Sequence, residues 1–181
     1  VAARIDGAAG PWVSLTWPGF AGVLQGMASG RFSAALNQAP MATPVGVLPA
    51  DWAFNRGRVW RRRALPPAHL LRHVFETAPS YAEARRLLIE TPICVPTIFT
   101  IAGLRAGEGA VIERRETSAH VLSGETCTAN VWQSQDWRGR AGFPIPCPPT
   151  TRRSPSTGVQ DASSAVPCSA TSTGRASPIA G

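Results

Sequence analysis

Lysine is absent from this chain of 181 residues, and arginine supplies all 18 basic side chains. The formal net charge of +7 would favour a nucleic-acid partner, because basic surfaces bind phosphate backbones through counterion release. The arginines are scattered, however, apart from Arg61, Arg62 and Arg63. Loss of lysine beside abundant Ala, Gly and Pro is typical of a very GC-rich coding sequence. We therefore expect no nucleic-acid partner, and an Arg-rich binding protein centred on Arg56 to Arg63 is kept as the alternative.

Long apolar runs are also missing. No stretch reaches the roughly 18 apolar residues of a membrane-spanning helix, so the sequence predicts no membrane span. The first residues, Val1 to Arg4, lack both the basic region and the apolar stretch of a signal peptide. Because an initiator Met is absent too, we expect a piece of a longer protein. The chain itself predicts a cytoplasmic location, with an exported parent as the alternative, and its oligomeric state stays open.

Cysteine is sparse, and its spacing excludes the common metal sites. Cys94, Cys127, Cys147 and Cys168 form no C-x-x-C pair and have no histidine at ligand spacing. Phosphate loops, dinucleotide fingerprints and nucleophile elbows are absent as well. We therefore expect neither a metal nor another cofactor. Cys94 and Cys127 lie in apolar, strand-like segments, where buried thiols are common, and disulfides are the alternative if the protein is exported.

The composition divides the chain near residue 141. Residues 141–181 consist mostly of Ala, Gly, Pro, Ser and Thr, with one acidic residue, Asp161, and no apolar periodicity. Such a segment buries too little apolar surface to offset its ordering entropy. We expect residues 1–140 to form one domain. Residues 141–181 are then a low-complexity tail, either disordered or translated out of frame, that carries no chemistry.

Within the first 140 residues, strand patterns flank two helices. Leu70, Leu71, Val74 and Phe75 lie on one face of a helix that begins after Pro66 and Pro67. Ser80 and Glu83 form a capping box for a second helix that ends at Glu90. A loop is expected over Pro40 to Pro49 and turns over Gly26 to Gly30 and Gly103 to Gly109. The expected strands are Trp12 to Trp17, Phe20 to Leu24, Arg31 to Leu36, Cys94 to Ala102, Ala110 to Arg115, His120 to Leu122 and Thr126 to Trp132. Antiparallel hairpins around a helical pair predict an α+β domain with helices on one face of each sheet.

Four segments in order resemble one enzyme family, the N-terminal-nucleophile amide hydrolases that include acid ceramidase, N-acylethanolamine acid amidase and choloylglycine hydrolase. Ser14 to Asn37 is similar to the family phrase "aGyvGmltGmapGrfsvaLN". Ser80 to Ala102 and Gly107 to Arg114 are similar to "SYeeAkklL…aPayfilaG…GeGavItR". Thr128 to Gln133 resembles the strand "qtNhw". The resemblance spans about 120 residues, which makes coincidence improbable.

The resemblance implies part of a four-layer αββα sandwich and an activity on linear N-acyl amides. The substrates would be ceramide-like, N-acylethanolamine-like, or bile-acid- or penicillin-type amides, and the reaction would be hydrolysis or acyl transfer. In the family, an N-terminal Cys attacks the amide carbonyl, its own α-amine moves the proton, and fixed donors stabilise the oxyanion. Asn37 and Asn130 match two of those donors. Arg140 is a weaker match to an active-site arginine.

The nucleophile is missing from the resemblance. No Cys precedes Cys94, and an internal Cys lacks the free α-amine that this mechanism requires. Arg4 and Asp6 lie too close to Trp17 to be the family's positioning pair, so we interpret them as strand and turn residues. Trp12, Trp17 and Trp60 are expected to pack in the core, with an acyl pocket as the alternative. We expect the chain by itself to be inactive, and a decayed gene product is a third interpretation.

Overall fold

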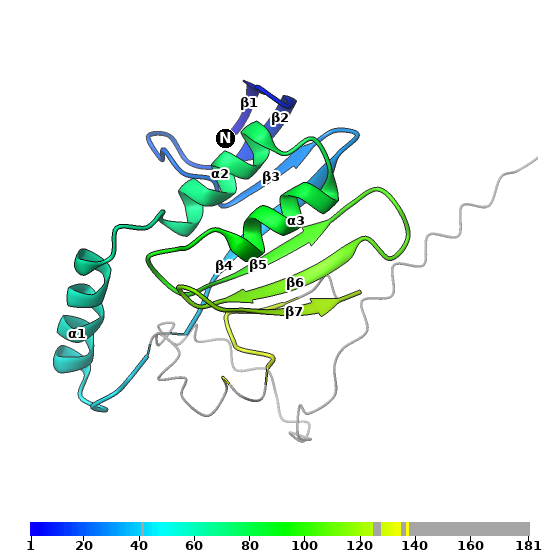
Figure 1. Cartoon of the computed structure of the whole chain (residues 1–181). Helices are drawn as coiled ribbons and strands as arrows, with labels where there is room; N and C mark the ends of the chain where they lie inside the picture. Colours follow the sequence, from blue (N-terminus) through cyan, green and yellow to red (C-terminus); the bar gives the residue numbers. More distant parts are fainter. Residues whose placement is uncertain (41, 125–127, 135–136, 138–181) are drawn as a thin grey trace, which may run out of the picture. The chain divides into compact units, whose positions relative to one another are not determined.

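The computed structural model describes residues 1–40, 42–124, 128–134 and 137. Its seven strands form one antiparallel sheet in which neighbouring strands follow chain order from β1 to β7 (Figure 1). The strands are β1 (Ala2–Gly7), β2 (Gly10–Leu15), β3 (Gln25–Ala28), β4 (Phe32–Gln38), β5 (Thr97–Ala102), β6 (Gly109–Arg114) and β7 (Ala119–Ser123). The helices are α1 (Leu48–Arg61), α2 (Pro67–Thr77) and α3 (Tyr81–Glu90). Among these helices, none is both long and apolar enough to cross a membrane.

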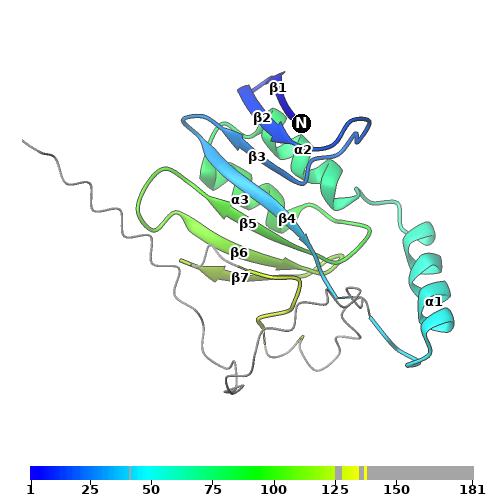
Figure 2. The same cartoon turned by 180° about the vertical axis from the view of Figure 1, so that it is seen from behind.

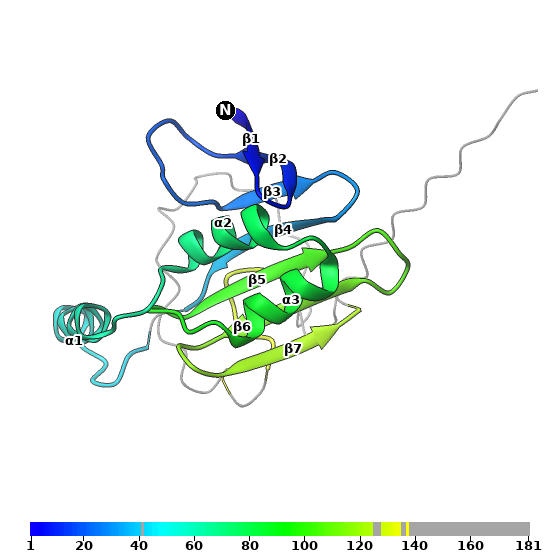
Figure 3. The ribbon, with the colours of Figure 1, turned by 45° about the horizontal axis from the view of Figure 1, so that its top comes forward.

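Helices α2 and α3 cover the same face of the sheet, and the main core lies between them and the strands (Figures 1 and 3). The predicted stripe of α2 is fully buried there: Leu70, Leu71, Val74 and Phe75. The Phe75 ring stacks between Trp12 of β2, at 5.0 Å, and Phe32 of β4, at 5.1 Å. Helix α3 begins as predicted, because the Ser80 hydroxyl accepts a hydrogen bond from the Glu83 backbone N–H at 3.3 Å. Both helix predictions are confirmed.

Two arginine side chains connect the sheet to the C-terminal ends of α2 and α3. Arg114 of β6 is buried, and its guanidinium donates to the carbonyls of Leu88 and of Thr91, the latter at 2.8 Å. Arg31, just before β4, donates to the Ala78 carbonyl at 2.6 Å, at the end of α2. Burial lowers the pKa of both guanidinium groups. A cation at a helix C-terminus satisfies the unpaired carbonyls and favours the helix dipole. These contacts fix where each helix ends on the sheet.

Helix α1 was not predicted, and the loop expected over Pro40 to Pro49 was wrong at its end. Pro49 lies in the first turn of α1, where a missing N–H costs nothing. The Asp51 carboxylate accepts hydrogen bonds from the backbone N–H groups of Val45, at 2.9 Å, and Gly46, at 3.0 Å. Much of α1 is exposed, including Trp52, Phe54 and Trp60. An exposed helix needs no continuous apolar stripe, so periodicity gave no signal for it.

Two strand predictions were wrong. Phe20 to Leu24 is not a strand; the strand is β3, which starts at Gln25 and includes Gly26 of the predicted turn. A Cβ on Gly26 would lie 2.9 Å from the Val13 carbonyl oxygen and 3.1 Å from the Phe75 ring, so this glycine permits close packing inside a strand. Residues 128–132, expected as a strand, have no regular structure; residues 126–127 of that prediction lie outside the described residues. The other predicted strands are confirmed with small shifts.

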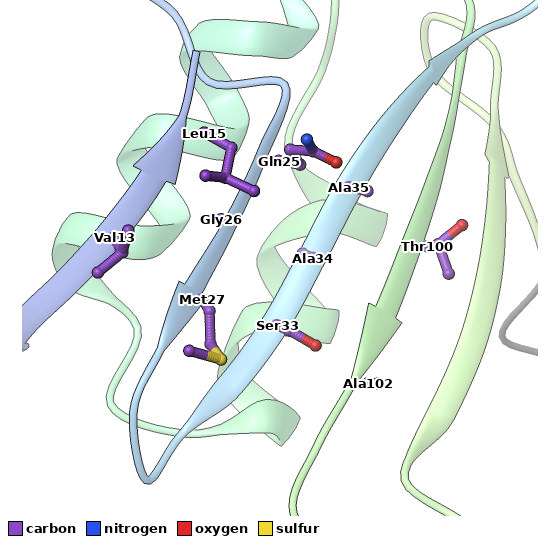
Figure 4. Close-up of a pocket in the computed structure, with 10 residues that line it drawn as sticks. All are labelled: Val13, Leu15, Gln25, Gly26, Met27, Ser33, Ala34, Ala35, Thr100 and Ala102. Atoms are coloured by element: carbon purple, nitrogen blue, oxygen red, sulfur yellow. The ribbon is translucent and has the colours of Figure 1, made fainter. Parts of the chain in front are cut away.

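The second face of the sheet is covered unevenly. Near β5 to β7, Trp132 packs on Ile98, Val111 and Ala39. Over β2 to β5, no described residue forms a covering layer, and a hollow of about 480 Å³ lies there. Val13, Leu15 and Met27 project from the sheet on this side, away from the helices (Figure 4). The Met27 side chain is 57% exposed. The predicted boundary between residues 140 and 141 lies outside the described residues and stays a prediction.

Candidate active site

Asn37 lies near the end of β4, on the sheet face opposite α2 and α3. Phe32 and Ala34 of β4 are in the helix-side core, so alternation places Ser33, Ala35 and Asn37 on the other face. The Asn37 side-chain Nδ2 donates to the Thr128 carbonyl at 3.3 Å. Its backbone carbonyl accepts from the Thr97 hydroxyl at 3.1 Å. Asn37 is therefore held by β5 on one side and contacts a segment 91 residues further along the chain.

A depression of about 720 Å³ borders Asn37. Its remaining lining is largely apolar and comes from the strand ends and from the loop after β2. The lining side chains that matter here are Leu15, Trp17, Leu24 and Leu36. Trp17 is 58% exposed and lies 5.3 Å from Phe20, ring centroid to ring centroid. The site thus combines an apolar wall with the neutral hydrogen-bonding side chains of Asn37, Gln25 and Thr16.

Asn130 lies two residues after Thr128. Both belong to the segment of residues 128–134, which comes after β7 in the chain (Figure 2). This segment, residues 128–134, is irregular, and Asn130 itself is exposed. Because Asn37 donates to Thr128, the structure brings the segments of the two predicted asparagines together, although Asn37 and Asn130 are 93 positions apart in the sequence. The third predicted residue, Arg140, lies outside the described residues.

Glu113 was not singled out from the sequence, although it lies beside this region. Its side chain is 0% exposed, and the carboxylate accepts hydrogen bonds from the backbone N–H groups of Gln133 and of Ser134, the latter at 3.1 Å. His120 Nδ1 lies 3.8 Å from Glu113 Oε2. An available signal was the charge itself, because Glu113 follows Ala110, Val111 and Ile112 within an apolar strand.

Comparison with known proteins connects this geometry to one family. Acid ceramidase of Mus musculus is 35% identical over 103 residues, which are 55% of this chain and 24% of that protein. Acid ceramidase of Homo sapiens is 34% identical over 102 residues, again 55% of this chain and 24% of that protein. The chain therefore spans about a quarter of the length of these relatives. No family model matches the chain.

A solved structure agrees in fold. The Caenorhabditis elegans ortholog of N-acylethanolamine-hydrolyzing acid amidase superposes with a TM-score of 0.52 and 22% identity. The match covers 68% of this chain and 51% of that one. These likenesses support the acid ceramidase-like family of N-terminal-nucleophile hydrolases, which the sequence had indicated by resemblance. The sheet and helices of this chain are a part of that α+β fold, as the sequence predicted.

Cys94 lies in an environment that does not favour a reactive thiolate. It is a free cysteine, 8% exposed, at the start of the segment that leads into β5. Burial raises the pKa of its thiol, whereas a reactive cysteine needs an environment that lowers it. Cys127, Cys147 and Cys168 lie outside the described residues. The described part of this acid ceramidase-like chain also holds no group of three or more possible metal ligands.

The other residues considered from the sequence lie in β1, in the core or at the surface. Arg4 and Asp6 lie on β1, as a strand interpretation predicted. Trp12 is a core residue, as predicted, but Trp17 and Trp60 are exposed. Exposure of Trp60 follows from the position of α1, which no periodic pattern had indicated.

The arginine-rich stretch over residues 56–63 is partly paired within the acid ceramidase-like chain. The Arg56 guanidinium lies 5.1 Å from the Trp52 ring centroid and 4.5 Å from that of Trp60. Arg58 forms an ion pair with the Glu116 carboxylate, and Arg62 lies 3.6 Å from the same oxygen. Two of the basic side chains on which a phosphate-binding surface would rest therefore face a carboxylate of this chain.

Proposed function

We propose that this chain is part of an amidase that acts on the carbon–nitrogen bond of linear N-acyl amides, by hydrolysis or acyl transfer. Asn37 and Asn130 would donate hydrogen bonds to the carbonyl oxygen as negative charge develops on it. The observation that carries the proposal is the hydrogen bond from Asn37 to Thr128, which joins the two asparagine-bearing segments. The likeness to acid ceramidases over half of the chain supports the same reaction class.

The chemistry of asparagine fits this role. Its side-chain amide has two N–H donors and no charge that titrates. One N–H of Asn37 is used by the Thr128 carbonyl, which orients the amide and leaves a second N–H for a substrate. Preorganised donors of this kind favour the charge that appears in the transition state over the neutral ground state. Asn37 is thus held before the substrate arrives.

The substrate class follows from the surroundings of Asn37. An acyl chain needs an apolar surface, and its amide carbonyl needs a donor at the end of that surface. The depression lined by Leu15, Trp17, Leu24 and Leu36 beside Asn37 supplies both. Relatives named for ceramide and for N-acylethanolamine hydrolysis point to lipid amides in particular. Bile-acid- and penicillin-type amides are the less apolar members of the same class.

The attacking group must come from outside the present sequence. Its earliest cysteine is Cys94, which is buried and internal. An internal residue has no α-amine to accept the thiol proton, so the family's mechanism cannot operate on it. We therefore expect the 181-residue chain to bind an N-acyl amide without cleaving it. Incubation with N-lauroylethanolamine and with a short-chain ceramide should release no fatty acid above a protein-free control, and steady turnover would overturn this expectation.

Binding tests the proposed donors directly. N-lauroylethanolamine, added below its aggregation concentration, should shift the side-chain amide resonances of Asn37 and Asn130 in an NMR titration. Asn37→Ala should abolish the response of Asn130 or weaken binding roughly tenfold, the usual value of one lost hydrogen bond in a site. The matched control is Asn55→Ala, because Asn55 donates to Ala42 and Asp51 carbonyls in the α1 region. Saturable binding that leaves both asparagines unshifted would contradict the assignment.

A further inference from the structure

The segment of residues 128–134 is irregular and is held on the sheet in part by side-chain contacts. Trp132 is buried against Ile98 and Val111. Trp137 packs edge-on against Trp132, with the ring centroids 5.0 Å apart. Apolar packing holds the segment on the sheet, but it is not directional. The polar contacts at its two ends must therefore decide where Asn130 lies.

Glu113 makes the contacts that follow Asn130. Val111 contacts Trp132, so alternation along β6 places Glu113 on the same face as Val111. A fully buried carboxylate is costly unless its oxygens accept hydrogen bonds. Both oxygens do so: Oε1 accepts from the Gln133 N–H, and Oε2 from the Ser134 N–H at 3.1 Å. Hydrogen bonds are directional, and two of them end on this one carboxylate, so Glu113 is a directional clamp on residues 133–134.

Asn37 makes the contact that precedes Asn130. Across the sheet, Asn37 pairs with Ile98, Ile98 pairs with Glu113, and Glu113 pairs with His120. Asn37 and Glu113 are therefore in the same row, on the strands either side of β5. One holds Thr128 by its carbonyl, and the other holds residues 133–134 by their N–H groups. Asn130 lies between these two attachments.

The charged groups around Glu113 favour a positioning role. His120 lies across from it on β7, with Nδ1 3.8 Å from Oε2. Arg114, the next residue, faces the helices and donates to α3 carbonyls. The Arg115 guanidinium lies over the Trp137 ring at 4.5 Å. In the described part of the chain, this buried carboxylate thus accepts hydrogen bonds from backbone N–H groups and not from an arginine.

We propose that Glu113 is a positioning residue that fixes Asn130 through the backbone of residues 133–134. The functional meaning rests on the proposed role of Asn130. The clamp itself does not, because it is defined by hydrogen bonds that can be measured without a substrate.

Residue-resolved amide exchange of the full chain tests the clamp. In Glu113→Gln, the Gln133 and Ser134 N–H groups should exchange roughly tenfold faster, because one side-chain oxygen is replaced by a donor. Phe99 and Ile101 in β5 should keep their wild-type rates. The matched control is Glu108→Gln: the Glu108 carboxylate also accepts from two backbone N–H groups, those of Leu104 and Arg105, both at 3.1 Å. That variant should accelerate exchange at residues 104–105 alone.

Two outcomes would overturn the clamp. The first is an exchange rate at Gln133 and Ser134 that stays within twofold of wild type in Glu113→Gln. The second is an equal acceleration throughout β5 and β6, which would make Glu113 a general stability residue. If the Glu113→Gln variant loses its cooperative unfolding transition, the same exchange measurement is made on Glu113→Asp. That variant keeps a carboxylate but moves its oxygens away from residues 133–134 by one methylene.

A titration separates this inference from the proposed function. With N-lauroylethanolamine, Glu113→Gln should keep the shift of the Asn37 amide and lose that of Asn130. If the exchange result holds but wild-type Asn130 never responds, the amidase proposal fails and the clamp stands. If wild-type Asn130 responds and Glu113→Gln leaves its response unchanged, the clamp fails as a positioning device while the amidase proposal stands.

Discussion

Asn37 and Glu113 lie in one row of the sheet, on β4 and β6, and hold opposite ends of the segment that carries Asn130. Asn37 is an uncharged donor and Glu113 is a buried carboxylate, and both contact the same irregular segment of residues 128–134. Loop residues placed by a rigid sheet are a common source of binding groups. Here the sheet determines both attachments, so disturbing the sheet should disturb the proposed site. The predictions below test the contacts that keep the sheet and its helices in place.

Phe75 should be the most sensitive of the core aromatics. Phe75→Ala removes the ring that lies between Trp12 and Phe32 and leaves a cavity under β2 to β4. We expect a loss of about 3–5 kcal/mol in the free energy of unfolding by urea. The control is Phe54→Ala on α1, where the side chain is 48% exposed; a change below about 0.5 kcal/mol is expected there. Similar losses for both variants would show that α1 is part of the cooperative core.

Gly26 and Gly57 should respond to alanine with opposite signs. At Gly26 a methyl group would meet the Val13 carbonyl and the Phe75 ring, so Gly26→Ala should cost about 1–3 kcal/mol of unfolding free energy. At Gly57, in the middle of α1, no atom lies within 4 Å of an added methyl. Gly57→Ala should favour the helix by up to about 1 kcal/mol. Urea unfolding and helical circular dichroism measure both, and a stabilised Gly26→Ala would contradict the packing of β3 on α2.

Arg114 should contribute to stability through the end of α3. Arg114→Met keeps much of the buried volume but leaves the Leu88 and Thr91 carbonyls without their donor. The expected loss is about 2–3 kcal/mol, the range for hydrogen bonds to a charged group. Arg86→Met is the control, because Arg86 pairs with Glu83 and Glu90 on the exposed face of the same helix, and exposed ion pairs contribute little to stability. Equal losses of unfolding free energy in the two variants would contradict a stabilising role for the Arg114 hydrogen bonds at the end of α3.

The Cys94 thiol should be less reactive in the folded chain than in the unfolded one. Burial raises its pKa, so at pH 8 a smaller fraction is the reactive thiolate. Iodoacetamide should therefore modify the Cys94 peptide more slowly in buffer than in concentrated urea, as measured by mass spectrometry. Because the folded pKa is the higher one, the associated stability is present below the unfolded pKa, near 8.5, and is lost as the pH rises through the folded pKa. Equal rates in both solvents would rule out a buried thiol.

A Cys94→Ala variant provides the control for the pH effect. Its unfolding free energy should vary less between pH 8 and pH 10 than that of the wild type, roughly in proportion to the protons released by Cys94. If the unfolding free energy of Cys94→Ala depends on pH as strongly as that of the wild type, another titrating group is responsible for the dependence. The substitution also tests Cys94 against the proposed chemistry, since binding of N-lauroylethanolamine should not change.

Local sequence determined the elements whose signals are local. The stripe of α2, the Ser80 cap of α3 and the apolar runs of β5 and β6 all identified their elements, because periodicity and capping are properties of a few neighbouring residues. The resemblance to the amide hydrolases could also be found from the sequence, since it rests on similar segments in the same order. Helix α1 could not be predicted, because an exposed helix has no apolar stripe. The strand at Gly26 was missed because the reason for its glycine, the close approach of the Val13 carbonyl and the Phe75 ring, is visible only in the structure.

Tertiary structure decided everything that depends on residues distant in the chain. The sequence proposed Asn37 and Asn130 separately, by resemblance, and could not show that Asn37 reaches Thr128. Nor could it show that Glu113, one acidic residue at the end of an apolar strand, is buried beneath residues 133–134. The physical reason is that the register of β4, β5 and β6 places these side chains in a row. Register comes from the packing of the whole sheet, which no short stretch of sequence contains.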